Sequence, residues 1–156
     1  ILKVSDAGER FHSRLNAVEK TYCYRIAVPG VSHVFDRKYL WHFPEPLDIQ
    51  KMEQAASFLI GTHDFKGFSS IRRTKKSTVR ELYAIDIEKK EKEILISFTG
   101  NGFLHNMVRI LTGTLAEVGC GKKKPEDVLT VFQTKDRQDA GMTAPPQGLF
   151  LVSVKY

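Results

Sequence analysis

The sequence is poor in the residues that build disulfide or metal-held frameworks. Only two of its 156 residues are cysteine, Cys23 and Cys120, and its five histidines are scattered along the chain. Neither set has the close spacing that is typical of a disulfide framework or a zinc site. We therefore expect no metal ion and no disulfide, and a protein that works in the reducing cytoplasm.

The chain also lacks long apolar runs and an excess of acidic residues. No stretch approaches the roughly 20 apolar residues that a membrane helix requires, and the opening "ILKVSD" does not have the layout of a signal peptide. Lys and Arg number 24 against 18 Asp and Glu, which gives a net charge of +6. Such a surplus favours a polyanionic partner, nucleic acid first. Because the chain begins without Met and its first four residues resemble the end of a strand, we expect a piece of a longer protein.

The periodicity of apolar residues predicts one α+β domain, for which the length and the 42% of apolar residues suffice. Alternation indicates strands, and repeats at i, i+3 and i+4 indicate helices. The expected elements are a strand at 20–28, a helix within 46–61, strands at 79–88 and 93–99, helices at 104–118 and 124–133, and a strand at 148–156. This order predicts a ferredoxin-like split β-α-β unit, with helices packed on one face of an antiparallel sheet.

The segment "IRRTKKSTVR" is the most concentrated positive charge in the chain. It holds five basic residues and no acid, namely Arg72, Arg73, Lys75, Lys76 and Arg80. Alone, it is equally compatible with a solvated loop. Its Ser and Thr residues can bind phosphate oxygens, and Lys122–Lys124 forms a second basic cluster. Together the two clusters favour contact with RNA or DNA.

Arg109 is the single charge of most interest in the helix expected at 104–118. It lies off the apolar stripe, on a side shared with His105, Thr112 and Gly113. The residues beside it are small enough to let a ligand or another backbone come close. The pattern leaves two readings open: an Arg that faces solvent, or a buried guanidinium that binds a carboxylate or phosphate through two hydrogen bonds.

Tyr22 and Tyr24 share one face of the strand expected at 20–28. Ordinary cross-strand packing in a sheet explains this pattern. A platform on which a nucleic-acid base stacks explains it as well, and the basic runs elsewhere in the chain support that second interpretation. The residues alone do not decide between the two.

Four segments, in one order and at matching spacing, resemble the tRNA pseudouridine synthases of the A (TruA) type. They are "FHSRLNAVEKTYCYRI", "EPLD…M…AA..LIGTHDFKGF", "NGFLHNMVRILTGTLAEVG" and "KDRQDAGMTAPPQGLFLVSVKY", which cover nearly the whole chain. The resemblance is to the C-terminal half of that family. It implies that residues 1–156 form a C-terminal domain, and that the N-terminal half with the catalytic Asp is absent from this chain.

The resemblance also implies an activity and its partners. Enzymes of this family isomerise uridine to pseudouridine in the anticodon arm of tRNA, without a metal or an organic cofactor. Two ferredoxin-like halves meet along one sheet and enclose the active site, and the enzymes are usually homodimers. We therefore expect tRNA as the partner. A non-catalytic ferredoxin-like RNA-binding module is the alternative, and a small-molecule-binding domain fits the charge pattern less well.

Three residues take roles from the matching motifs. Tyr22 in "YCY" corresponds to the tyrosine that stacks on the target base, and Leu149 in "QGLFL" to the leucine that packs against it. Arg109 in "HNMVR" corresponds to the arginine that pairs with the catalytic Asp, keeping it ionised and lowering its pKa. The cations of the basic segment and His105 are then expected to contact RNA.

Two Asp-Ala-Gly triplets in the chain mimic the catalytic loop of the family. One begins at Asp6 and the other at Asp139, within "RQDAG". An Asp on such a turn could be a nucleophile or an ordinary acid in a loop. Both triplets lie inside or beside segments that match the C-terminal half of the family. We therefore expect both to be ordinary loops, and the nucleophile to lie outside this chain.

Overall fold

The computed structural model describes residues 4, 6–31 and 33–156, so the strand ending expected at the very start falls mostly outside the described residues. Within them lie six strands, three helices and a short 3-10 turn. In chain order they are β1 (Glu19–Ala27), β2 (Trp41–His42), α1 (Ile49–Ser57), β3 (Gly61–Asp64), β4 (Val79–Lys89), β5 (Glu93–Gly100), α2 (Met107–Gly119), α3 (Asp127–Thr134), the turn η1 (Pro146–Gly148) and β6 (Leu149–Lys155).

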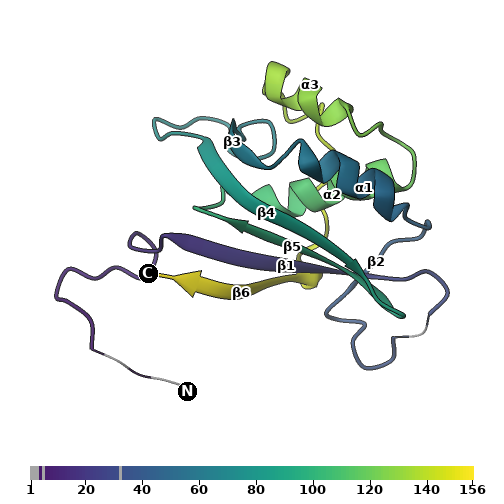
Figure 1. Cartoon of the computed structure of the whole chain (residues 1–156), viewed down its shortest axis with the longest axis horizontal. Helices are drawn as coiled ribbons and strands as arrows, with labels where there is room; N and C mark the ends of the chain where they lie inside the picture. The colour runs from purple at the N-terminus through teal and green to yellow at the C-terminus, as the bar shows by residue number, and fades with distance from the viewer. Residues whose placement is uncertain (1–3, 5, 32) are drawn as a thin grey trace.

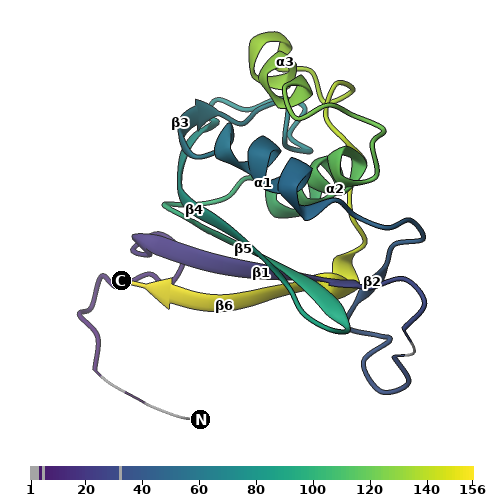
Figure 2. The same cartoon turned by 45° about the vertical axis from the view of Figure 1, so that its right-hand side comes forward.

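The long strands form a sheet in the order β6-β1-β5-β4, and β3 extends it beyond β4. Strand β1 is central: β5 pairs with it along one edge, while β6 and the short β2 share the other edge. Helix α1 connects β1 to β4, and α2 connects β5 to β6. Both helices lie on the same face of the sheet (Figures 1 and 2). This arrangement confirms the α+β, ferredoxin-like prediction.

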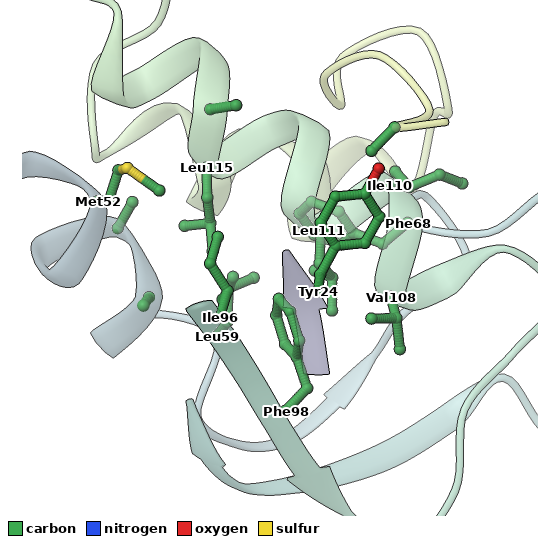
Figure 3. Packing of buried hydrophobic residues seen from close by; sticks show 14 of the residues in the cluster. Tyr24, Met52, Leu59, Phe68, Ile96, Phe98, Val108, Ile110, Leu111 and Leu115 are labelled. Carbon is green, nitrogen blue, oxygen red and sulfur yellow. The ribbon is translucent and has the colours of Figure 1, made fainter. Parts of the chain in front are cut away.

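The core lies between that face and the two helices. Tyr24 on β1, Ile96 and Phe98 on β5, and Leu111 and Leu115 on α2 are fully buried, and their side chains meet in one cluster (Figure 3). Burial of a side chain of this size stabilises a fold by about 1.5–3 kcal/mol. The cluster therefore fixes the position of α2 relative to β1, which are the elements that carry the candidate site.

Some details differ from the sequence-based expectations. The sheet is not wholly antiparallel, because β2 pairs in parallel with β1. Strands β2 and β3 were not predicted, since two and four residues are too few to show a period. Helix α2 begins at Met107 rather than at 104, because Asn106 has a φ of 60° and interrupts helical geometry. None of the described helices is long and apolar enough to cross a membrane.

Candidate functional site

Arg109, on the first turns of α2, is held by acceptors at two of its nitrogens. Its Nε donates to the carbonyl oxygen of Ala144 at 2.6 Å, and its Nη1 donates to Oδ1 of Asn106 at 3.0 Å. Its Nη2 makes no hydrogen bond with the described residues, and no described carboxylate lies within 4.0 Å of the half-buried guanidinium. The orientation is therefore fixed while donors remain for a carboxylate or phosphate.

The Ala144 acceptor is available because a distant loop packs directly on α2. A side chain at Gly113 would place its Cβ only 1.9 Å from the carbonyl oxygen of Met142, so only glycine fits there. One residue earlier in the loop, the amide of Gly141 donates to Thr114 Oγ1 at 2.9 Å. The prediction that small residues beside Arg109 allow the close approach of another backbone is thus confirmed. The backbone that packs there is that of residues 141–144.

Tyr24 completes the support of Arg109 from the sheet. Its hydroxyl donates to the carbonyl oxygen of Pro145 at 2.6 Å, which ties β1 to the residue that follows Ala144. Burial raises the pKa of this hydroxyl far above its ordinary value, and the charge of Arg109 opposes the shift only in part. Tyr24 therefore stays protonated and acts as a donor. The sequence pattern left Tyr24, like Tyr22, open between packing and a stacking platform, and its complete burial shows that its ring packs in the core.

Tyr22 and Leu149 lie on the same side of the sheet as this cluster. Tyr22 is two residues from Tyr24 on β1, and its half-buried ring meets Phe103 edge-on at a centroid distance of 5.2 Å. Leu149 pairs with Tyr24 across β1 and β6, and is also half-buried. Tyr22 and Leu149 are therefore neighbours of Tyr24, and Tyr24 binds the residue next to the Ala144 carbonyl that holds Arg109.

The basic segment forms an exposed loop that leads into β4. Arg72, Arg73, Lys75 and Lys76 are all exposed, and within the described part of the chain none has a carboxylate within 4.0 Å. They line a hollow of about 590 Å³. Arg80, at the start of β4, instead turns back and donates to the carbonyl oxygens of Ser77 and Val79. A loop with so many unpaired cations is suited to phosphate groups.

The same loop is tied at both ends. At its start, the amide of Ser70 donates to the carbonyl oxygen of His105, whose side chain is exposed, and Asn106 Nδ2 donates to Ser70 Oγ at 3.0 Å. Asn106 thus contacts both the base of the loop and Arg109. At the other end, Asp64 accepts from Thr78 Oγ1 at 2.6 Å.

Asp64 also pairs with Lys135 at 2.8 Å. Burial raises the pKa of the Asp64 carboxyl, but hydrogen bonds from Lys135, Thr78 and Lys66 outweigh burial and lower it below its ordinary value. The carboxylate is therefore ionised and anchors the loop end next to α3.

Asp139 has a local structural role. Its carboxylate accepts from Thr134 Oγ1 at 2.6 Å, and its carbonyl oxygen accepts from Lys123 Nζ at 2.9 Å. These contacts fasten the loop after α3, and none joins Asp139 to Arg109.

Asp6 is an exposed residue near the start of the chain. Lys122 pairs with Glu45 at 2.5 Å, so two members of the second basic cluster bind the protein itself.

Comparisons with known proteins agree on one family. The family model described as tRNA pseudouridine synthase matches residues 55–156. The chain is 46% identical over all 156 residues to tRNA pseudouridine synthase A of Thermoanaerobacter sp. (strain X514) and covers 64% of that protein. It is 42% identical to the enzyme of the same name from Bacillus pumilus (strain SAFR-032), again over its whole length, and covers 63% of it.

These matches define the ferredoxin-like chain as a pseudouridine synthase half-domain. The chain belongs to the tRNA pseudouridine synthase family. It spans slightly less than two thirds of the length of the curated relatives that it matches. Among the described residues, no three His, Cys, Asp or Glu side chains are grouped so that they could hold a metal ion.

Proposed function

We propose that the protein is a tRNA pseudouridine synthase that isomerises uridine in the anticodon stem-loop. This chain forms its C-terminal domain and supplies Tyr22, Leu149 and Arg109, while the nucleophilic Asp comes from the remaining length that the relatives possess. The observation that carries the proposal is the guanidinium of Arg109. It is fixed by Ala144 and Asn106 with donors to spare, and Tyr24, which pairs with Leu149, binds the residue next to Ala144.

The reaction exchanges one bond of the substrate for another. The bond from ribose C1′ to uracil N1 breaks, the freed uracil turns, and a new bond forms from C1′ to C5. The proton on C5 is lost and N1 gains one, so nothing is oxidised or reduced. Arg109 keeps the attacking carboxylate ionised and aimed. Tyr22 and Leu149 bound the faces of the base, so that the detached uracil turns without escaping.

The rest of the proposal concerns partners and setting. Arg72, Arg73, Lys75, Lys76, Arg80 and His105 contact the tRNA backbone. The enzyme works in the cytoplasm as a homodimer, and it uses neither a metal nor an organic cofactor. The redox-neutral exchange of bonds supports the absence of a cofactor. The exposed, unpaired cations of the loop support the contact with RNA.

The test is the release of tritium from tRNA labelled at uridine C5, measured with the full-length protein and its Arg109→Ala variant. Loss of one partner of a buried ion pair costs about 3–5 kcal/mol. We therefore expect the rate to fall by about 10²- to 10⁴-fold. The variant Arg137→Gln removes a half-buried arginine that binds only Thr143 among the described residues, and serves as the control. Undiminished release by Arg109→Ala contradicts the proposed role.

The exposed basic loop also favours a second candidate, a non-catalytic RNA-binding module. This candidate predicts that the full-length wild-type protein binds tRNA and releases no tritium. The same experiment therefore separates the two functions.

A further inference from the structure

A second hollow, of about 750 Å³, lies next to Tyr22 and has no assigned role. It is bounded by the turn at residues 12–18, the start of β4 and the segment 101–103 that follows β5. Leu15 and Phe103 give it apolar walls, and Arg14, Lys20 and Lys76 line it with positive charge. No acidic side chain is among its described lining residues. Such a combination suits a ligand with one flat apolar part and one anionic part.

The turn at residues 12–18 is built by its own hydrogen bonds. The amides of Arg14 and Leu15 both donate to Nδ1 of His12, at 3.2 and 3.3 Å, and the amide of His12 donates to Asn16 Oδ1 at 2.7 Å. The amide of Val18 donates to the carbonyl oxygen of Lys155 and fastens the turn to the end of β6. The turn therefore presents Arg14 and Leu15 in a defined conformation.

The hollow lies beside Tyr22 of the candidate active site. Phe103 lines the hollow and also meets the ring of Tyr22 edge-on at 5.2 Å. Lys20 precedes Tyr22 by two residues on β1, so both side chains project from the same face of the strand. A ligand in the hollow would thus be a direct neighbour of a base stacked on Tyr22.

We propose that this hollow binds the nucleotide next to the target uridine in the RNA chain. Its base lies against Leu15 and Phe103, and its phosphate is bound by Arg14 and Lys20. The inference rests on the proposed function, because extruding one base draws the neighbouring backbone toward the protein. It assigns a task to the turn at residues 12–18.

The test for the phosphate uses the full-length protein and an anticodon stem-loop RNA in which single phosphates are replaced by neutral methylphosphonates. The double variant Arg14→Gln/Lys20→Gln is compared with Lys89→Gln/Lys92→Gln, which removes the same charge at the opposite end of the β4–β5 hairpin. We expect the first variant to reduce the slope of log K against log salt by about 0.7–0.9, since Arg14 and Lys20 bind one phosphate and each contacted phosphate contributes that amount. The control should leave the slope unchanged.

The position of the phosphate follows from a double-mutant cycle. A methylphosphonate beside the target uridine should weaken binding to the wild type and leave binding to Arg14→Gln/Lys20→Gln nearly unaffected. Equal weakening of both proteins, or an unchanged salt slope, overturns the inference. The rate at saturating RNA should remain within about twofold of the wild type, because neither residue touches the reacting base.

The position of the base can be mapped with a photo-crosslinking phenylalanine derivative in place of the exposed Leu15. We expect crosslinks to a nucleotide adjacent to the modified uridine, and crosslinks only to distant nucleotides overturn the inference. Tritium release is measured in parallel. Adjacent crosslinks without release by the wild type would contradict the proposed function alone, and release with distant crosslinks would contradict the hollow alone.

Discussion

Two regions meet at the start of α2, and they are built in opposite ways. Arg109 lies under the packed loop at 141–144 and donates hydrogen bonds to a fixed backbone carbonyl and to the side chain of Asn106. The loop at 71–80 is exposed, and its hydrogen bonds are mostly local ones, such as the amide of Lys76 to Thr74 Oγ1. Aiming a carboxylate depends on angle, whereas binding a phosphate backbone depends mainly on charge. The construction of each region suits its proposed task.

The largest effect is expected when the packed region is forced apart by Gly113→Ala. The new methyl group would lie 1.9 Å from a backbone oxygen that cannot move without displacing the loop. We expect a loss of about 3 kcal/mol or more in the free energy of unfolding, measured by urea denaturation of the full-length protein. Gly8→Ala, where nothing lies within 4 Å, is the control and should change it by less than about 0.5 kcal/mol. Similar values for the two variants would mean that the packing is not tight.

A smaller effect is expected at Asn106, which touches both regions. Asn106→Gly tolerates the φ of 60° and removes the hydrogen bond to Arg109 Nη1. A hydrogen bond to a charged group contributes about 1.5–3 kcal/mol, so the catalytic rate should fall by about 10- to 100-fold with little change in stability. Ser70→Ala removes only the contact of Asn106 with the loop and should leave the rate near that of the wild type. A full wild-type rate in Asn106→Gly would show that Arg109 needs no such support.

The exposed loop should respond to charge alone. Arg72→Gln/Arg73→Gln should weaken tRNA binding and lower the salt slope by about 1.8 at most, with the rate at saturating tRNA unchanged. Arg73→Lys should bind within about twofold of the wild type, whereas Arg109→Lys, at a site of fixed geometry, should lose most of its activity. Equal tolerance of lysine at both positions would break the distinction between the two regions. Filter binding at several salt concentrations measures the tRNA affinity and its salt slope, and tritium release measures the catalytic rate.

The sequence predicted the order of the long elements because each carries an apolar period over seven or more residues. It did not predict β2 or β3, whose pairing depends on neighbours supplied by β1 and β4. It placed the start of α2 three residues too early, because the apolar stripe continues through Leu104 although the backbone does not remain helical. The available signal in the sequence was Asn106 itself, since Asn adopts the left-handed conformation more readily than most residues.

In the candidate site, too, some features could be predicted from the sequence and others depend on the fold. The choice of Arg109, Tyr22 and Leu149 came from motif resemblance, and the pattern alone left Arg109 open between solvent and a buried contact. Its hydrogen bond to Ala144 spans 35 residues of sequence, so no local pattern could indicate it. Tyr24 likewise has its partner 121 residues away, at Pro145. Contacts of this kind are set by the packing of α2 on the sheet, which only the fold reveals.

The smallest effect concerns the anchored end of the loop at Asp64. The pKa of this carboxyl is lowered in the folded protein, so its contribution to stability is present above the unfolded value of about 3.9 and is lost as the pH falls through the folded value. We expect the difference in the free energy of unfolding between wild type and Asp64→Asn to be constant above about pH 5 and to shrink below about pH 4. Thr78→Val, which removes one donor, should give a smaller gap over the same range. A gap independent of pH would mean that the charge of Asp64 anchors nothing. No described contact joins Asp64 to Arg109. At a pH low enough to loosen the loop at 71–80, the amides of residues 141–144 should therefore remain protected from hydrogen exchange.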